Sequence, residues 1–246
     1  MTDEMTDCII EAKSVIRKFG SGAREVHALR GIDLSVRRGE LTLLMGPSGS
    51  GKTTLLLVLG CMLTPTSGTV TICGTSTSNL DKEALAKLRR DHIGFVFQSY
   101  HLFPTLTAVQ NVQLALDIRG EHGRRAVKRS DEALARVGLE SKIRARPNEL
   151  SGGEQQRVAI ARAIVANPSI ILADEPTAAL DGENGRTIMR SLADIAHERD
   201  RAVLVVTHDP RVIPFADRIV HIEDGLLADE APGEIERLRP PKAVSG

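Results

Sequence analysis

The chain has 246 residues, and 41% of them are hydrophobic, which is enough for the core of one large domain or of a domain with a subdomain. Its 32 lysines and arginines balance its 32 aspartates and glutamates, so the formal net charge is zero. This balance argues against a generally basic surface for nucleic acid, although it leaves room for a local patch.

Cysteine usage and the first residues bear on the compartment. The three cysteines lie far apart and lack metal-ligand spacing, which is typical of small apolar side chains in a reducing compartment. Residues 1–7 are polar and acidic, unlike a secretory signal, and the leucine-rich run at 55–63 falls well short of the ~20 residues of a membrane span. We therefore expect a cytoplasmic protein that reaches a membrane only through a partner.

The period of the apolar residues predicts alternating strands and helices. We expect strands at 9–16, 32–36, 41–45, 70–73, 93–98, 170–173, 202–206, 218–223 and 226–228, and helices at 55–59, 82–90, 105–118 and 185–198, with a further helix that starts near 151 and ends at 167–168. The runs at 170–173 and 202–206 are apolar without alternation, as in strands buried on both faces of a parallel sheet. Asp224-Gly225 predicts a hairpin turn.

The middle of the chain differs from what flanks it. Residues 119–146 carry many arginines and lysines mixed with acidic residues, which favours a solvated helix face. We assign residues 81–165 to a mostly helical subdomain and residues 9–80 and 166–230 to the core, within a single domain. The proline-containing tail at 231–246 is expected to be partly disordered.

A glycine-rich stretch follows the strand at 41–45. It matches the P-loop pattern G-x-x-x-x-G-K-[ST] and comprises Gly46, Pro47, Ser48, Gly49, Ser50, Gly51, Lys52, Thr53 and Thr54. Glycines let backbone N–H groups approach phosphate oxygens, and the helix N-terminus favours an anion. Lys52 can reach the terminal phosphates, and the Thr53 hydroxyl suits Mg²⁺, which prefers oxygen ligands. An ordinary strand-to-helix turn is the alternative, but the full pattern favours a nucleoside triphosphate site with magnesium.

Asp174 and Glu175 follow the apolar strand at 170–173. An acidic residue at the end of a buried strand is costly unless something uses it, and ligands bind at this end of the strands in an open parallel sheet. Asp174 suits magnesium, directly or through water, and Glu175 suits a general base for the attacking water. Ordinary polarity at a strand end is the alternative, which the P-loop makes less attractive.

A second glycine-rich helix start lies at Leu150-Ser151-Gly152-Gly153. Its hydroxyl and bare N–H groups could cap the helix or sense a phosphate. Spacing does not decide whether Ser151 reaches the nucleotide of the same chain or that of another. Gln98 and His208 each stand at the end of an apolar strand. A lone histidine in that position is more often structural than functional, and Gln98 considered alone is ambiguous as well.

Together with Asp181, these motifs occur in an order that resembles the ATP-binding subunit of an ABC transporter, over about residues 9–230. The resemblance implies an α/β fold, namely a P-loop NTPase core of mixed sheet and helices with an antiparallel β region and a helical subdomain. It also implies ATP hydrolysis with Mg²⁺, a second copy of the chain in an ATP-dependent dimer, and a membrane permease that holds the protein on the inner face of the plasma membrane.

The same resemblance assigns roles to single residues. Residues 46–54 become the Walker A loop, and Gln98 contacts magnesium and water and links to the permease. Asp174 is the Walker B aspartate, and Glu175 is the catalytic glutamate. His208 is the switch histidine that orients the water. Ser151, Gly152 and Gly153 would contact the γ-phosphate of ATP held by the partner chain, and Asp181 would lie at the dimer interface. Phe19 stands where many relatives place a tyrosine against adenine, with core packing as the alternative.

Residues 46–52, 101–112 and 150–163 resemble the lipoprotein-release and macrolide-export group, and residues 173–181 resemble the DevA-type exporters within it. Those ATPases pair with permeases that have a large extracytoplasmic domain, which implies a lipid, lipoprotein or drug-like substrate. An importer or cell-division ATPase of the same fold stays open. A soluble ABC ATPase acting on DNA or ribosomes would predict a coiled-coil insertion, a second cassette or a basic surface, so we expect no nucleic acid partner.

Overall fold

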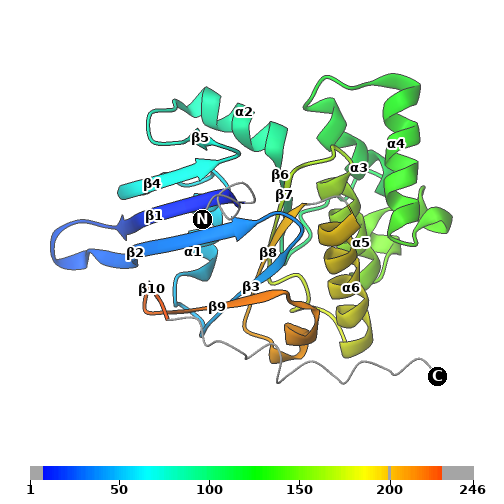
Figure 1. The fold of residues 1–246 in the computed structure, drawn as a ribbon. Coiled ribbons are helices and arrows are strands. Elements are labelled where there is room, and N and C mark those ends of the chain that lie inside the picture. Colours follow the sequence, from blue (N-terminus) through cyan, green and yellow to red (C-terminus); the bar gives the residue numbers. More distant parts are fainter. Residues whose placement is uncertain (1–7, 199–200, 229–246) are drawn as a thin grey trace.

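The computed structural model describes residues 8–198 and 201–228, and the expectations for residues 1–7 and 231–246 lie outside them. A central sheet contains β3 (Leu41–Met45), β6 (Ile93–Val96), β7 (Ile170–Asp174), β8 (Ala202–Thr207), β9 (Arg218–Glu223) and β10 (Leu226–Leu227). Its order is β10-β9-β3-β8-β7-β6, and every neighbouring pair is parallel except β10 with β9 (Figure 1).

A second, antiparallel sheet consists of β1 (Cys8–Phe19), β2 (Val26–Arg37), β4 (Ser67–Ile72) and β5 (Thr75–Ser76), in the order β2-β1-β4-β5. β1 and β2 are longer than the strands predicted at 9–16 and 32–36. Irregular register between Ala12 and Val15, where Ser14 has a φ of 49°, interrupts the period of two on which the prediction relied.

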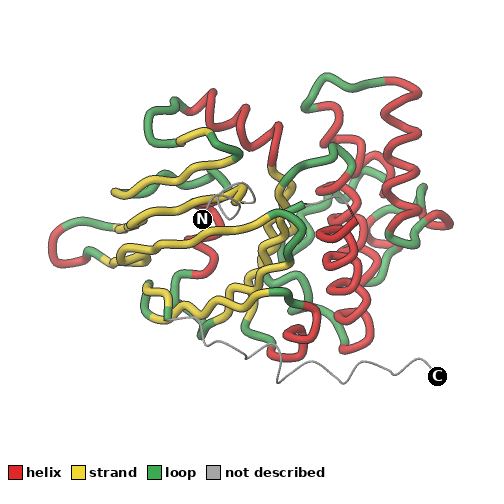
Figure 2. The backbone as a smooth tube through the Cα atoms, viewed as in Figure 1, coloured by secondary structure: helices red, strands yellow, loops and turns green. Residues whose placement is uncertain are grey.

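The helices are α1 (Lys52–Leu59), α2 (Lys82–His92), α3 (Ala108–Asp117), α4 (Gly123–Arg136), α5 (Gly152–Ile164) and α6 (Gly182–Glu198), with short 3-10 turns at Gly22–Arg24, Glu140–Lys142, Pro147–Glu149 and Pro210–Phe215. Helices α3 to α6 gather on one side of the central sheet, whereas α1 lies on the other side with the antiparallel sheet (Figures 1 and 2).

Alternation along the buried strands explains this division. Leu43 of β3 packs into a core with α3 to α6, whereas its neighbour Leu44 packs into a core with α1, β1 and β2. In β7, Ile171 and Leu172 divide between the two cores in the same way. Both faces of these strands are therefore covered, which confirms the interpretation of their continuous apolar runs.

Local signals decide where several elements begin. The helix predicted at 105–118 starts at Ala108, because Thr107 and Gln110 form a capping box. In the basic stretch, α4 buries one narrow stripe and leaves most of its charged residues exposed, as predicted. Asp224 and Gly225 both have positive φ and form the predicted hairpin turn between β9 and β10. No helix within the described residues is long and apolar enough to span a membrane.

Candidate functional site

The carboxyl ends of four neighbouring strands meet along one edge of the central sheet. Met45 of β3 is in register with Thr207 of β8, and Val206 of β8 with Asp174 of β7, while β6 continues in parallel beyond β7. Ligands bind at this edge in open parallel sheets. The fold thus brings four predicted segments to one edge, namely the P-loop, Asp174-Glu175, His208 and the turn that contains Gln98.

The P-loop needs glycine at two positions for steric reasons. A Cβ on Gly46 would lie 2.0 Å from the carbonyl oxygen of Ile222, and a Cβ on Gly51 would lie 2.5 Å from that of Ala28. Gly51 also has a φ of 104°, which side chains strongly disfavour. No side chain caps α1, so its first N–H groups lack intrahelical partners and are available to an anion.

Lys52 lies inside the loop with only 7% of its surface exposed. Its Nζ donates to the carbonyl oxygens of Gly46 and Pro47, at 2.8 and 2.7 Å. Among the described residues no carboxylate forms an ion pair with this ammonium group. A buried cation with neutral partners favours a bound anion, because the anion supplies the missing charge.

Thr53 and Asp174 supply two oxygen ligands at one point. The Thr53 hydroxyl donates to Oδ1 of Asp174 at 3.2 Å, although the two residues come from α1 and β7. Burial and the neighbouring charge of Glu175 raise the pKa of Asp174, so a cation would relieve an unfavourable negative charge. The described residues contain no cluster of three or more His, Cys, Asp and Glu for a metal. This donor set fits Mg²⁺, which completes its shell with phosphate and water.

Glu175 is held on three sides. Its Oε1 lies 2.7 Å from Nδ1 of His208, its Oε2 accepts from the Thr207 hydroxyl at 3.2 Å, and its backbone N–H donates to Val206 at 2.9 Å. Its φ of 46° is a left-handed conformation that costs ~1–3 kcal/mol in a non-glycine residue. A carboxylate fixed in this way is suited to receive a proton from a positioned water.

Gln98 lies in an exposed turn rather than at the end of a strand. β6 ends at Val96, and the turn is closed by a hydrogen bond of 3.1 Å from the N–H of Tyr100 to the carbonyl of Phe97. The strand predicted to continue to Gln98 is therefore two residues too long. The turn leaves the same edge as Asp174, because β6 and β7 are parallel neighbours.

Ser151 caps α5. Its Oγ accepts from the N–H of Glu154 at 3.3 Å, and the Glu154 carboxylate accepts from the N–H of Ser151 at 2.8 Å. Those hydrogen bonds hold the pKa of Glu154 below its usual value. The central sheet separates α5 from α1, and no hydrogen bond or ion pair within the described residues links residues 151–153 to the P-loop. The chain does not bring Ser151 to its own phosphate cradle.

Asp181 adjoins the start of α5. Its carboxylate accepts from the backbone and side-chain N–H groups of Asn184, at 2.9 and 2.8 Å, and these bonds lower its pKa. A Cβ on Gly153 would lie 2.9 Å from Oδ1 of Asn184, and one on Gly152 would lie 3.7 Å from Leu180. The residues predicted to face a second chain therefore form one continuous region.

Phe19 is exposed at 41%, and the guanidinium of Arg17 lies 4.7 Å from its ring centroid. Phe19 pairs with Val26 of β2, two residues before Ala28, whose carbonyl contacts Gly51 of the P-loop. Two strand residues span ~7 Å, so the ring lies within reach of a base attached to phosphates in the cradle.

Sequence reasoning missed two contributors to this site. Thr207 orients Glu175, and its only signal is a polar residue at the end of an apolar strand. Asn184 orients Asp181 from the first turn of α6, and no sequence pattern indicates it. The roles of the predicted residues in nucleotide binding and hydrolysis stay predictions.

A sequence model described as ABC transporter matches residues 29–178. The chain is 46% identical over 226 residues to a probable export ATP-binding/permease protein of Pseudomonas fluorescens (strain Pf0-1), and 44% identical over 230 residues to the macrolide export ATP-binding/permease protein MacB of Bartonella henselae. These alignments cover 92% and 93% of this chain but 35% of each relative. The chain thus spans about a third of the length of these curated relatives.

Solved structures give the same picture. The ATP-binding cassette MJ0796, in a dimeric post-hydrolysis state bound to ADP and Pi, matches with a TM-score of 0.84 and 44% identity over 90% of this chain and 97% of that one. The cbiO1 protein from Clostridium perfringens, part of the transporter complex cbiONQ, matches with a TM-score of 0.82 and 30% identity over 94% of this chain and 92% of that one.

Proposed function

The chain belongs to the ABC transporter family, and from that premise we propose that it binds and hydrolyses ATP in an export system, dimerises on ATP and drives a membrane permease. The observation that carries the proposal is the position of Glu175. Its carboxylate is held by Thr207, the last residue of β8, and by His208, which follows it. β8 lies next to β3, the strand that leads into the P-loop. A carboxylate beside a phosphate cradle is the arrangement that hydrolysis of a phosphoanhydride needs.

The binding step follows from the cradle. The free N–H groups of α1 and the ammonium of Lys52 hold the β- and γ-phosphates, and Phe19 stacks on the adenine. Thr53 and Asp174 are the residues that would hold Mg²⁺, whose charge offsets that of the phosphates. When the anion enters, Lys52 exchanges its carbonyl partners for phosphate oxygens.

The hydrolytic step needs an oriented water. Glu175 accepts a proton from the water that attacks the γ-phosphorus, while His208 and Gln98 hold that water in line. Because Thr207 and His208 both bind the Glu175 carboxylate, the base is in place before the nucleotide arrives. Hydrolysis is then mainly positioning and charge stabilisation.

A second copy of the chain completes the site. Ser151 and the N–H groups of Gly152 and Gly153 lie away from the P-loop of their own chain, so a partner related by two-fold symmetry would present them to the γ-phosphate. Asp181 adjoins them and would contact the partner at the same interface. The dimeric state of the cassette MJ0796 supports this proposal.

The relatives named for export support an exporter over an importer or a cell-division ATPase. In this proposal the chain works on the inner face of the plasma membrane with a permease that has a large extracytoplasmic domain, and the substrate is a lipid, lipoprotein or drug-like molecule. Because the relatives are ATP-binding/permease proteins, the permease is the partner to identify first, by purification of the chain from membranes.

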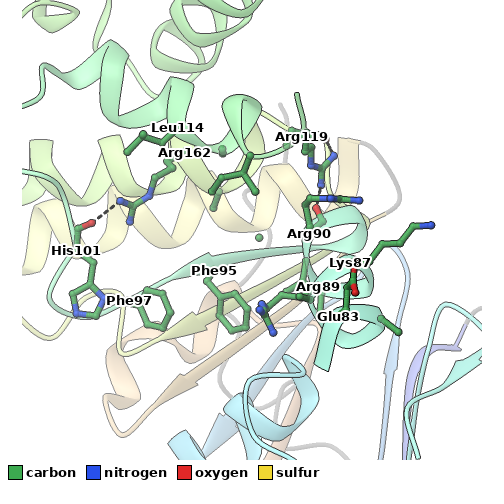
Figure 3. Close-up of a pocket in the computed structure, with 18 of the residues that line it drawn as sticks. Glu83, Lys87, Arg89, Arg90, Phe95, Phe97, His101, Leu114, Arg119 and Arg162 are labelled. Carbon is green, nitrogen blue, oxygen red and sulfur yellow. Dashed lines mark hydrogen bonds between the residues drawn. The ribbon is translucent and has the colours of Figure 1, made fainter. Parts of the chain in front are cut away.

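A groove of about 1140 Å³ beside the Gln98 turn offers a docking surface for that permease (Figure 3). Its floor is apolar and aromatic, with Phe95 and Phe97 stacked at 5.4 Å. Five cationic residues line it against two acidic ones: Lys87, Arg89, Arg90, Arg119 and Arg162, against Asp81 and Glu83. The surface therefore fits a short permease segment with an apolar anchor and acidic flanks.

Charge reversal tests the docking surface. Lys87→Glu should reduce recovery of the chain with the permease, and Lys82→Glu, on the same helix but outside the groove, should not. ATP binding by the separated chain should be unchanged in both. Equal recovery of the two variants would show that the permease docks on another surface of the chain.

The central experiment is Glu175→Gln. This change should leave binding of ATP with Mg²⁺ intact and lower steady-state hydrolysis by ~10²–10⁴-fold, the usual contribution of a positioned base. Glu140→Gln is the matched control, because it makes the same substitution in an exposed 3-10 turn that is distant in the sequence from Glu175. Wild-type turnover by Glu175→Gln would remove Glu175 from the role of base. Sedimentation of the same variant with ATP tests the dimer.

A further inference from the structure

The turn that carries Gln98 ends in two consecutive residues with left-handed backbone. Tyr100 and His101 have φ values of 59° and 48°. Residues other than glycine seldom adopt this region, and they persist there when the surrounding structure holds them. The end of the turn therefore needs a partner that holds it in place.

The guanidinium group of Arg162 on α5 is that partner. Its Nη1 donates to the carbonyl oxygen of His101 at 2.6 Å (Figure 3), and its Nη2 donates to that of Tyr100 at 2.7 Å. The planar fork binds two adjacent acceptors at once, which a lysine ammonium does not reproduce. No carboxylate pairs with Arg162 in the part of the chain that the structure describes. The half-buried charge is thus committed to these two carbonyls, and burial lowers its pKa.

The same turn contacts the groove and the beginning of α5. The centroid of the His101 ring lies 4.9 Å from that of the Phe97 ring, and Phe97 forms part of the aromatic floor of the groove in Figure 3. On the other side, the hydroxyl oxygen of Tyr100 lies 3.0 Å from the place of a Cβ on Gly152. Helix α5 therefore contacts the turn at two points, through the side chain of Arg162 and through Gly152 at the N-terminus of the helix.

We propose that Arg162 is a positioning residue, which ties the turn of residues 97–101 to the helix that begins after Ser151. Gln98 and Ser151 then keep one relative position, although they come from separate segments. The inference rests on the proposed function, because it concerns how Gln98 is presented to the nucleotide.

The chain carries its own probe of this turn. Tyr100 is the single tyrosine of the sequence, which has no tryptophan, so tyrosine fluorescence reports on this residue alone. The side chain is half-buried. Release of the turn would expose the ring to a soluble quencher such as acrylamide.

Arg162→Lys is the decisive variant, and Arg129→Lys is its control. Arg129 is also half-buried, and its Nη2 donates to the carbonyl of Val165 at the opposite end of α5, at 2.7 Å. Arg162→Lys should raise the acrylamide quenching constant of Tyr100 roughly twofold and lower kcat about tenfold, with little change in KM for ATP. Arg129→Lys should change none of these quantities.

A second change separates positioning from general structural damage. Glycine takes a positive φ without strain, so His101→Gly combined with Arg162→Lys should restore much of the kcat. Unchanged quenching in Arg162→Lys, or equal losses in Arg129→Lys, would overturn the inference. Because fluorescence does not depend on turnover, the quenching result decides the inference even if the wild-type chain hydrolyses no ATP, an outcome that would overturn the proposed function instead.

Discussion

Ser151→Ala separates the two roles that the fold gives to this residue, which caps α5 and is proposed to bind the partner chain's γ-phosphate. Loss of an N-cap costs ~1 kcal/mol, within a usual range of roughly 0.5–2 kcal/mol. For a chain of this length that corresponds to a fall of ~2–4 °C in melting temperature. The Glu154 side chain would keep its hydrogen bond to the N–H of residue 151, so the loss should stay near the middle of that range.

The effect on hydrolysis should be larger. The Ser151 hydroxyl accepts from the N–H of Glu154 when it caps the helix, and a hydroxyl that accepts a hydrogen bond still carries a proton that it can donate to phosphate. A hydrogen bond to a charged group contributes ~1.5–3 kcal/mol, which corresponds to about a 10- to 150-fold loss of kcat/KM.

Thr107→Ala is the matched control, because Thr107 and Gln110 form the same type of capping box on α3. Melting curves without nucleotide, ATPase rates and sedimentation with ATP and Mg²⁺ should be compared for both variants. Both should lose similar stability, but only Ser151→Ala should lose hydrolysis and dimer formation. If Thr107→Ala lost as much activity as Ser151→Ala, the γ-phosphate role of Ser151 would be refuted and capping alone would explain the residue.

Four other changes have defined outcomes. Lys52→Ala should abolish detectable ATP binding in equilibrium dialysis, because the anion loses the one buried cation of the described cradle. Gly46→Ala should prevent folding or distort the loop, as circular dichroism and ATP binding would show, since its Cβ would lie 2.0 Å from a carbonyl oxygen. Phe19→Ala should weaken ATP binding by ~5- to 150-fold if the ring stacks on adenine, and an equal Kd in titration calorimetry would exclude that contact. Asp174→Asn should stabilise the nucleotide-free chain at pH 7 yet impair Mg²⁺-dependent binding. Burial raises the pKa of the Asp174 carboxyl, so its ionised form opposes folding above that pKa, and the advantage of asparagine in urea unfolding should vanish as the pH falls toward the unfolded value near ~4.

Several elements of this structure could be predicted from the sequence, because each depends on local interactions. The P-loop pattern, the apolar strands at 170–173 and 202–206, the capped start of α5 and the Asp224-Gly225 turn each depend on neighbours within a few residues, and the structure has these elements where they were predicted. Asp174 and Glu175 could be singled out because charge at the end of a buried strand is unfavourable without a use. The division of the chain into a core and a helical subdomain stays a prediction.

The tertiary structure alone decided which of these segments meet. The order β10-β9-β3-β8-β7-β6 places the P-loop beside Thr207 and Asp174 beside Val206, pairs that are separated by long stretches of sequence and set by packing on both faces of the sheet. It also put α1 and α5 on opposite faces and the guanidinium of Arg162 on the Tyr100 turn. The period of the apolar residues does not reveal such contacts, because it depends on each segment alone. The two partners lie in different segments and meet only when the core has formed.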